Sequence, residues 1–414
     1  MTEKPIQLTL TAQTYGGEAI GRYNGKAVFV PFALPGEIVR ARIVEERKNF
    51  SRAELLEVVK ASPERIAPKC PHYTRCGGCH YQHLAYADQL TAKTEILRDQ
   101  LSRIGKIANP PVKQIVASPI EWNYRNNIQF HLDENAKLGF ISAVANPAQP
   151  DSTLSVLPIS ECHLPEAALN ALWPTLEFEP GAPIERVSLR AGDELMLILE
   201  SDQVETPEME LESDISVVHL LEDDTIIMAG DDYILIEVLG KPFKVSAASF
   251  FQVNTVMAAK MVEHLLAVLP VSQKTTLLDV YCGVGLFSAF FAPRVKKVIG
   301  IELAPSSCED FSVNLDEFEN VDLYEAFAEE VLPELEEYAD IVILDPPRAG
   351  LDRAVIDALI QIRPETIAYV SCDPATLARD AARLIAGGYR LKQVTPFDLF
   401  PQTYHIESIS IFES

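Results

Sequence analysis

The sequence predicts a multidomain protein with three parts: an N-terminal OB-like β-barrel in residues 1–60, a central α+β domain in residues 61–249, and a C-terminal α/β domain with a Rossmann-like sheet in residues 250–414. Three observations predict this division. Short strands separated by glycine turns fill the first part, and three closely spaced cysteines open the second. From Phe250 onward, strands and helices alternate, as in doubly wound α/β domains.

The composition is that of an ordinary globular protein, with 48% apolar and 23% charged residues. We find no run of about 18 apolar residues, so we expect no membrane span. The stretch from Met1 to Pro5 lacks the basic and apolar regions of a secretory signal, so we expect a cytoplasmic protein.

The formal net charge of −25 argues against a nucleic-acid partner at first sight, but the charge is unevenly distributed. Residues 191–240 hold fifteen acidic and no basic residues, whereas residues 1–110 hold sixteen basic and eleven acidic ones, a net of +5. The acidic block is typical of a solvated rim. The overall charge therefore does not exclude RNA binding.

Four segments predict strands of the N-terminal barrel: residues 7–11, 27–30, 36–44 and 53–59. Turns are expected at Gly16-Gly17, Gly21, Asn24-Gly25 and Pro35-Gly36. Basic and aromatic residues interleave along this barrel: Arg22, Tyr23, Lys26, Phe29, Phe32, Arg40, Arg42, Arg47, Lys48, Phe50 and Arg52. Such a face can stack bases and hold phosphates, and the alternative is a solvated barrel with ordinary surface charges.

Cys70, Cys76 and Cys79 form a C-x5-C-x2-C run that indicates metal binding, and Cys162 is the next cysteine along the chain. Structural zinc sites usually show two paired C-x2-C knuckles, which this run lacks. Three close cysteines and one distant cysteine fit an iron–sulfur cluster at least as well. Zinc stays open as an alternative, with His72, His80 or His83 replacing one thiolate.

Apolar residues at helical spacing predict a helix over residues 84–106. Gly105 and the Pro110-Pro111 pair end this helix, and the helix can pack on the C-terminal domain. The rest of the central part predicts strands at residues 128–132, 187–189, 195–199, 215–221, 225–228 and 234–238.

The C-terminal part predicts a helix over residues 254–269 and a sheet built from strands at residues 276–280, 298–301, 341–344, 366–370, 391–395 and 407–412. Ligands bind at the carboxyl ends of the strands in such sheets. The first strand runs into a D-x-x-x-G-x-G pattern from Asp279 to Gly285, and Glu302 ends the second, where it can bind ribose hydroxyls. Without a third glycine or a Gly-Lys-Ser/Thr run, this pattern favours S-adenosylmethionine over a dinucleotide or a P-loop ligand.

Cys372 follows a buried strand and precedes a helix for which Asp373 is the expected N-cap, with Pro374 at the first position. A helix N-terminus favours the thiolate, which is a nucleophile, although a small buried filler is the alternative. If the strand at residues 407–412 runs antiparallel, Glu407 lies at the same edge of the sheet as Cys372. Asp345 begins the run Asp345-Pro346-Pro347-Arg348, which follows the strand predicted at residues 341–344 and so lies at the carboxyl end of that strand.

Taken together, these motifs resemble the RNA uracil-5-methyltransferases, specifically the iron–sulfur group that includes bacterial 23S rRNA enzymes. The resemblance covers nearly the whole chain, including an N-terminal TRAM barrel. It rests most on Phe250-Phe251-Gln252-Val253-Asn254, Ser371-Cys372-Asp373-Pro374-Ala375-Thr376 and Pro401-Gln402-Thr403-Tyr404-His405-Ile406-Glu407. Leu286 and the run Ala326-Phe327-Ala328 depart from the family pattern near the donor and the adenine.

The resemblance implies a role for each candidate residue. Cys372 is the expected nucleophile and Glu407 the base; Gln252, Tyr281, Glu302 and Asp345 are expected to contact S-adenosylmethionine; and Cys70, Cys76, Cys79 and Cys162 are expected to hold a 4Fe–4S cluster. The chemistry agrees, because addition of a thiolate to carbon-6 of uracil makes carbon-5 nucleophilic, and a base must later remove the carbon-5 proton. A paired uracil must be flipped out to be reached.

We therefore expect a monomeric RNA methyltransferase that makes 5-methyluridine in 23S rRNA, with a tRNA T-loop uridine as the alternative target. A non-catalytic RNA-binding iron–sulfur protein is the alternative from another class, and the presence of Cys372 and Glu407 argues against it. A small-molecule methyltransferase would have no need of the N-terminal barrel.

Overall fold

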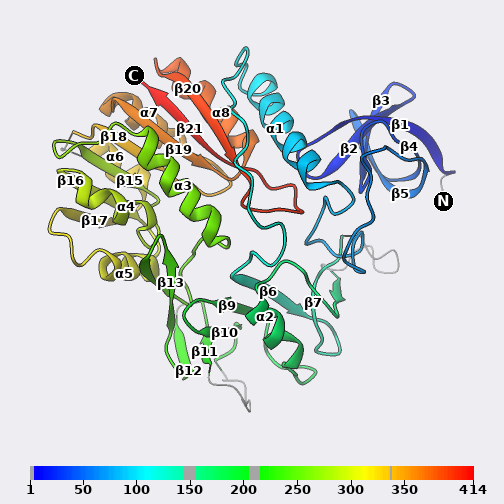
Figure 1. The fold of residues 1–414 in the computed structure, drawn as a ribbon, viewed down its shortest axis with the longest axis horizontal. Helices are drawn as coiled ribbons and strands as arrows, with labels where there is room; N and C mark the ends of the chain where they lie inside the picture. Colours follow the sequence, from blue (N-terminus) through cyan, green and yellow to red (C-terminus); the bar gives the residue numbers. More distant parts are fainter. Residues whose placement is uncertain (1–3, 144–154, 205–214, 223, 336–337) are drawn as a thin grey trace.

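The computed structural model describes residues 4–143, 155–204, 215–222, 224–335 and 338–414. Part of the acidic block, residues 205–214 and 223, lies outside these described residues. The barrel, the central part and the C-terminal sheet are arranged around the middle of the molecule (Figure 1). Among the described residues, none of the helices combines the length and the apolar character that crossing a membrane requires.

The N-terminal part is a closed five-stranded barrel with strand order β1-β2-β3-β5-β4, so the predicted barrel is confirmed, although β2 was not among the four predicted segments. Its strands are β1 (Ile6–Gln13), β2 (Glu18–Tyr23), β3 (Lys26–Pro31), β4 (Ile38–Glu46) and β5 (Phe50–Lys60). Leu8, Leu10 and Val30 are buried at its centre. The prediction of a turn at Gly21 was wrong, because Gly21 lies within β2 and pairs with Leu10. A Cβ atom there would stand 2.5 Å from the Thr9 carbonyl oxygen, so the glycine serves close strand approach.

Helix α1 (Tyr86–Arg103) connects the N-terminal half to the C-terminal domain. Its Ile96, Leu97 and Leu101 join the core that also contains Leu377 and Ala378 of helix α8 (Pro374–Ala386). The expected helix therefore forms and packs on the C-terminal domain, and it lies between that domain and the barrel (Figure 1).

The central part is a seven-stranded sheet with order β12-β11-β10-β9-β6-β7-β8. Its strands are β6 (Asn127–Leu132), β7 (Leu138–Ile141), β8 (Val156–Pro158), β9 (Arg186–Ala191), β10 (Leu195–Glu200), β11 (Ser216–Leu220) and β12 (Thr225–Ala229). Helix α2 (Ala167–Leu172) and the 3-10 turn η1 (Trp173–Thr175) pack on it. Strands β7 and β8 are too short to show a clear alternation in the sequence, and we did not predict them.

A hairpin of β13 (Tyr233–Val238) and β14 (Lys241–Ser246) follows the central sheet. Its inner face shares one hydrophobic core with helix α3 (Thr255–Val268), through Ile236, Phe243 and Met261. The hairpin thus packs against the C-terminal domain, although it lies ahead of residue 250, our predicted start of that domain.

The C-terminal sheet has the order β17-β16-β15-β18-β19-β21-β20. Its strands are β15 (Thr276–Val280), β16 (Lys297–Glu302), β17 (Val321–Glu325), β18 (Ile341–Leu344), β19 (Thr366–Ser371), β20 (Arg390–Phe397) and β21 (Glu407–Glu413). All neighbours from β17 to β19 are parallel, and β21 is antiparallel to both β19 and β20. The sheet is therefore the expected Rossmann-like one with a reversed strand inserted before the edge.

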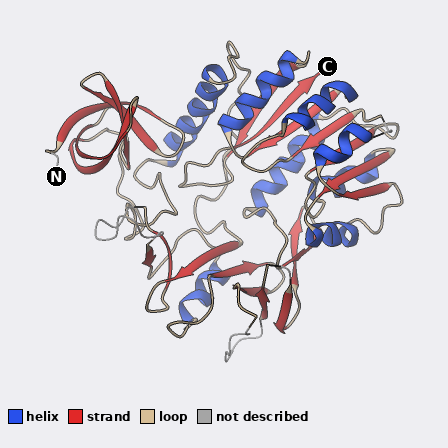
Figure 2. Cartoon of the chain, turned by 180° about the vertical axis from the view of Figure 1, so that it is seen from behind, coloured by secondary structure: helices blue, strands red, loops and turns tan. Residues whose placement is uncertain are grey.

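Helices cover both faces of this sheet (Figures 1 and 2). One core cluster joins the sheet to α3, α4 (Leu286–Phe291) and α5 (Pro305–Asn314), and the 3-10 turn η2 (Ala292–Arg294) follows α4. The other cluster joins it to α1, α6 (Ala328–Glu334), α7 (Arg353–Ile362) and α8. Because both faces of the sheet are buried, the strand sequences are continuous apolar runs instead of alternating apolar and polar residues.

Candidate active site

The antiparallel pairing of β19 and β21 brings Cys372 and Glu407 together. Ser371, the last residue of β19, pairs with Ser408 of β21, so the next residue on one strand faces the preceding residue on the other. Cys372 therefore lies opposite Glu407 at the carboxyl edge of the sheet. The predicted convergence of these two residues is confirmed at the level of strand pairing.

Asp345 belongs to the same group, because its charge and that of Glu407 raise the pKa of Cys372. Burial is the largest cause and, with the two carboxylates, raises the pKa of the Cys372 thiol to about 12, against a smaller lowering by Arg348. The expectation that the helix N-terminus favours a thiolate was wrong for the free protein. Burial and two neighbouring acids outweigh the helix dipole.

The two carboxyl groups also favour their protonated forms. Burial, reinforced by Asp345, raises the pKa of Glu407 well above its usual value, whereas Arg348 lowers it. Glu407 is 4% exposed, and its Oε1 atom has no hydrogen-bond partner among the described residues. Burial, with smaller effects from Asp279 and Glu302, raises the pKa of Asp345 to about 7. The site is therefore a partly buried group of acidic side chains that a cation would stabilise.

The glycine pattern after β15 forms a tight loop against the end of β16. The Gly283 amide donates a hydrogen bond of 2.9 Å to the Glu302 carboxylate, which also accepts from the Leu303 and Ala304 amides. Gly285 has φ +89°, and a Cβ atom there would stand 2.4 Å from Leu315, so only glycine fits. Tyr281 also has a positive φ, of +64°. This geometry fixes Glu302 beside the loop.

Asp279 lies beneath that loop and is fully buried. Its Oδ2 atom accepts hydrogen bonds from the Ser288 amide (3.1 Å) and hydroxyl (2.6 Å). Burial raises its pKa to about 7, although both hydrogen bonds lower it. Asp279 thus anchors helix α4 to the loop through Ser288.

Gln252 lies in the loop before α3, half-exposed. Its backbone carbonyl accepts a hydrogen bond from the Asn126 side chain (3.0 Å), and Asn254 caps α3 by accepting from the Met257 amide. None of the hydrogen bonds found within the described residues involves the Gln252 side chain. The assignment of this residue to the donor stays a prediction.

Asp373 caps helix α8, as predicted, by accepting hydrogen bonds from the Ala375 (2.8 Å) and Thr376 (3.0 Å) amides. Its second oxygen accepts a hydrogen bond of 3.0 Å from the Tyr15 hydroxyl of the barrel. Tyr15 was missed in the sequence because nothing local links it to a residue 358 positions away. The barrel therefore touches the residue next to the candidate nucleophile.

The loop before Glu407 is held from several sides by polar residues that the sequence did not indicate. Lys93 of α1 forms a fully buried ion pair of 2.6 Å with Asp398 and also bonds the Phe400 carbonyl (3.0 Å). Gln89, one turn earlier, exchanges hydrogen bonds with the amide and side chain of Gln402. Helix α1 thus fixes the segment that leads into the candidate base.

The four predicted metal-binding cysteines come together in the structure. All are free thiols of intermediate exposure. Burial is the main cause that raises the pKa of Cys79 to about 12, and the charges of Cys162 and Cys76 add to it. The charges of Cys76 and Cys70 likewise help raise the pKa of Cys162. Four thiols that affect one another in this way fit a group that binds thiolates.

Two of the three histidines near these cysteines use one ring nitrogen each in a hydrogen bond. His72 accepts a hydrogen bond of 3.0 Å from the Ser160 amide, and His83 bonds the Tyr73 hydroxyl at 2.5 Å. Within the described part of the chain, no three Cys, His, Asp or Glu side chains are close enough to share a single metal ion.

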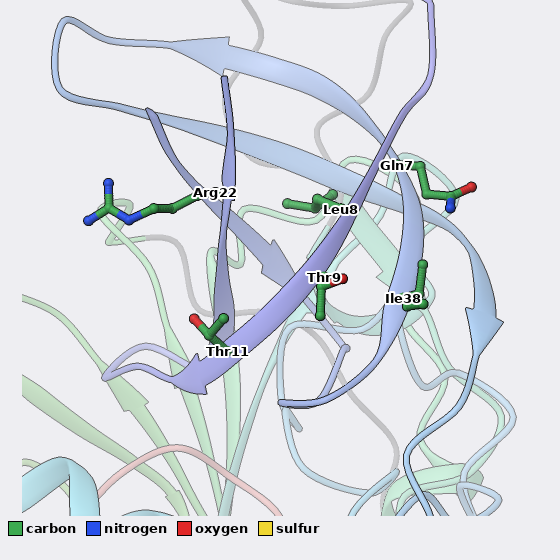
Figure 3. Close-up of a pocket in the computed structure, with 6 residues that line it drawn as sticks. All are labelled: Gln7, Leu8, Thr9, Thr11, Arg22 and Ile38. Atoms are coloured by element: carbon green, nitrogen blue, oxygen red, sulfur yellow. The ribbon is translucent and has the colours of Figure 1, made fainter. Parts of the chain in front are cut away.

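The barrel surface carries two hollows. One, of about 520 Å³, is lined by Gln7, Leu8, Thr9, Thr11, Arg22 and Ile38 (Figure 3). The other, of about 660 Å³, is lined by Glu45, Arg47, Lys48, Asn49, Phe50 and Arg52. Several basic residues of the predicted binding face pair with barrel carboxylates, as Arg40 does with Glu57 and Arg42 with Glu54. The positive charge of the barrel is therefore partly compensated.

Comparisons with known proteins give a consistent result. A family model described as tRNA (Uracil-5-)-methyltransferase matches residues 208–413, and the TRAM domain model matches residues 4–56. An uncharacterized RNA methyltransferase of Aquifex aeolicus (strain VF5) is 34% identical over 436 residues, covering 100% of this chain and 99% of its own. A second, from Thermosynechococcus vestitus, is 32% identical over 98% of this chain and 97% of its own.

Among solved structures, the tRNA (uracil-54, C5)-methyltransferase of Pyrococcus abyssi, in complex with S-adenosyl-L-homocysteine, is similar over 98% of this chain and 100% of its own. The TM-score is 0.75 and the sequence identity is 24%. At this identity, the similarity establishes the shared fold.

Proposed function

Because the chain belongs to the RNA uracil-5-methyltransferase family and carries a TRAM domain, we propose that it methylates a uridine of 23S rRNA through a covalent adduct of Cys372. S-adenosylmethionine-dependent methylation of carbon-5 of uracil in RNA is the activity of the family. The observation that carries the proposed mechanism is the Ser371–Ser408 pairing, which sets Cys372 opposite Glu407. A non-catalytic role is set aside, because the protein is an RNA methyltransferase.

The proposed reaction has three steps. The Cys372 thiolate adds to carbon-6 of the flipped uracil, and the ring electrons move to carbon-5 as an enolate. Carbon-5 attacks the methyl group of the donor, which leaves as S-adenosylhomocysteine. Glu407 then removes the carbon-5 proton, and the electron pair of that bond restores the double bond and expels Cys372. The uracil gains a methyl group and loses one proton.

The acidic side chains of the site support this sequence of events. In the free protein, the pKa values of Cys372, Asp345 and Glu407 are all raised, so the groups tend to hold their protons. The sulfonium of S-adenosylmethionine is a cation, and a nearby cation lowers the pKa of thiols and carboxyls. Donor binding would therefore promote ionisation of the nucleophile and the base, with Tyr281, Glu302 and Gln252 as further donor contacts.

We further propose that Cys70, Cys76, Cys79 and Cys162 hold a 4Fe–4S cluster, which is supported by their spacing in the sequence and by the effects of these thiols on one another's pKa values. When bound, such a cluster supplies four iron–thiolate bonds that tie residues 70–79 to the loop containing Cys162. The reaction steps above are carried by Cys372 and Glu407 alone.

Metal analysis tests the cluster. Protein purified without oxygen should be brown and should contain about four irons and four acid-labile sulfides per chain. Cys162→Ser should lose the colour and the iron, whereas Cys308→Ser, at a buried cysteine outside the cluster, should keep both. Stoichiometric zinc without sulfide in the wild-type protein would contradict the proposal.

The four-cysteine set supports 23S rRNA as the target, because the sequence resembles the iron–sulfur group that includes the rRNA enzymes. The alternative is a tRNA T-loop uridine, favoured by the matching family description, which names tRNA.

Mapping 5-methyluridine by mass spectrometry in rRNA and tRNA, from cells with and without the protein, separates the two targets. We expect one position of 23S rRNA to lose its methyl group in cells without the protein. Loss at a T-loop uridine would establish the alternative, and no loss in either RNA would contradict both.

A further inference from the structure

Four aromatic side chains from three distant parts of the chain meet beside Cys372. Tyr15 lies in the turn between β1 and β2, His80 follows the last close cysteine, and Tyr404 and His405 lie just before Glu407. Tyr404 is the centre of the group. Its ring centroid is 5.6 Å from that of Tyr15, 4.5 Å from that of His80 and 4.3 Å from that of His405.

This aromatic cluster borders the reacting groups. Tyr15 donates a hydrogen bond of 3.0 Å to Asp373, the residue that follows Cys372, and the charge of Cys372 acts on the Tyr15 hydroxyl. His405 is two residues before Glu407 in the chain. A uracil that reaches Cys372 must therefore enter next to these rings, and the rest of the RNA strand must pass close to them.

The cluster remains partly open to solvent. All four residues are intermediate in exposure. In contrast, Phe32 and Tyr73, which also join the barrel to the cysteine segment by a ring contact, are 8% and 7% exposed and are buried. Aromatic rings whose only role is to hold two domains in contact are expected to be buried, as Phe32 and Tyr73 are. The open faces of the cluster indicate a surface that receives another flat group.

The ring of His405 is uncharged at neutral pH. Burial, reinforced by the positive charge of Arg348, lowers its pKa to about 3. A neutral ring gives no charge attraction to a phosphate, whereas it stacks well on the face of a base. The chemistry of the cluster thus matches a nucleobase better than an RNA backbone.

Flipping a uridine out of a strand also removes one stacking partner from each neighbouring base. We propose that Tyr15, His80, Tyr404 and His405 form a stacking platform for the nucleobase that adjoins the target uridine in the RNA. This inference rests on the proposed function and adds a subsite for a second nucleotide. The platform accepts any base, because every base offers an aromatic face.

The test uses an RNA oligonucleotide that spans the uridine methylated by the wild-type enzyme, together with versions in which either flanking nucleotide is abasic. We expect one abasic version to raise the KM of the wild type about tenfold, in the range that loss of one stacked base produces. Tyr404→Leu should raise the KM for the intact RNA by a similar factor. Tyr404→Phe keeps the ring and should stay within about twofold of the wild type.

The decisive comparison combines both changes. If Tyr404 stacks on the missing base, the abasic RNA should cause little further loss with Tyr404→Leu, because the same contact is already absent. Tyr338→Leu removes an exposed tyrosine near the amino edge of β18, on the other side of the sheet, and should behave as the wild type with every RNA. Thermal unfolding and donor binding are measured for each variant.

Fully additive losses would overturn the inference and would leave the cluster a domain contact only. The abasic RNAs also test the inference with the wild-type enzyme alone, in case Tyr404→Leu does not fold. If the KM is unchanged for both abasic RNAs, no base next to the target uridine stacks on the enzyme. Failure of the wild type to methylate any RNA would instead overturn the proposed function. The two failures are therefore distinguishable.

Discussion

Cys372 and Glu407 share an environment that raises the pKa of both groups. Glu407 is buried and Cys372 partly buried, each lies near Asp345, and Arg348 is the neighbouring charge that opposes their raised pKa values. A base with a raised pKa removes a proton more strongly once it is ionised. The proposed roles of the two residues can be separated, because Cys372 is proposed to act at the first step and Glu407 at the last.

Single substitutions should stop the reaction at different points. Cys372→Ala should form neither product nor covalent RNA adduct, because no thiolate adds to carbon-6. Glu407→Gln keeps the size but lacks the base, so it should transfer the methyl group and then stall as a protein–RNA adduct. A denaturing gel with labelled RNA and donor, followed by mass analysis, detects the adduct. Full turnover by Glu407→Gln would show that the base is another residue.

The activity should depend on pH in a definite direction. The pKa of Cys372, raised to about 12, means that its ionised form increases with pH throughout the range 6–9. We expect kcat/KM for RNA to rise over this range without a plateau, because it reports the free enzyme. Arg348→Gln removes a charge that lowers the pKa values of both Cys372 and Glu407 and should move the profile to higher pH, whereas Arg348→Lys should move it less. A plateau already at pH 7 would contradict the expectation.

Among the elements, helix α1 has a role beyond covering the sheet. Its apolar side packs on α8, while Gln89 and Lys93 on the same helix hold the loop from Asp398 to Gln402. Both members of the Lys93–Asp398 pair are fully buried, so either charge would be left without a partner if the other were removed.

Breaking this ion pair should destabilise the protein. Lys93→Met should lower the free energy of unfolding by about 3–5 kcal/mol, because it leaves the buried Asp398 carboxylate unpaired. Adding Asp398→Asn should recover part of that loss. Lys260→Met, which removes an exposed pair with Glu263, should cost less than about 1 kcal/mol. Urea denaturation measures all four proteins, and equal losses for Lys93→Met and Lys260→Met would refute the interpretation.

At the scale of the whole molecule, the barrel supplies positive charge to an otherwise acidic protein. Residues 1–60 hold nine basic and seven acidic residues, a net charge of +2 within a chain of −25. The larger of the two barrel hollows has three cations and one carboxylate, with Arg47 and Arg52 both near Glu45. The barrel also contacts the catalytic domain through Tyr15. It is therefore placed to bind RNA that extends away from Cys372.

Neutralising this hollow should weaken RNA binding selectively. We expect the triple variant Arg47→Gln, Lys48→Gln, Arg52→Gln to bind RNA more weakly at low salt and to reduce the slope of log K against log salt by roughly 2, if each cation contacts one phosphate of a single strand. Donor binding should not change. The matched control removes three charges elsewhere, at Lys260, Arg186 and Arg294. An unchanged salt slope in the barrel variant would exclude these contacts.

The sequence by itself determined the succession of elements and most of the candidate site. The strand from residue 341 to 344, the cap at Asp373 and the four-cysteine set are all local patterns of apolar spacing, turn residues and cysteine spacing, and the structure retains them. Short strands such as β7 have too few residues to show an alternating pattern. Gly21 was predicted as a turn because its close contact is with Thr9 of another strand, which the local sequence does not reveal.

Only the tertiary structure decided which distant residues meet and how they ionise. The contacts of Tyr15 with Asp373 and of Lys93 with Asp398 join positions 358 and 305 residues apart, and no local pattern encodes such pairs. The helix N-terminus alone predicts a Cys372 thiolate, yet the folded environment raises its pKa to about 12. The physical reason is that burial and neighbouring acids, which arise from packing, outweigh the local dipole that the sequence reveals.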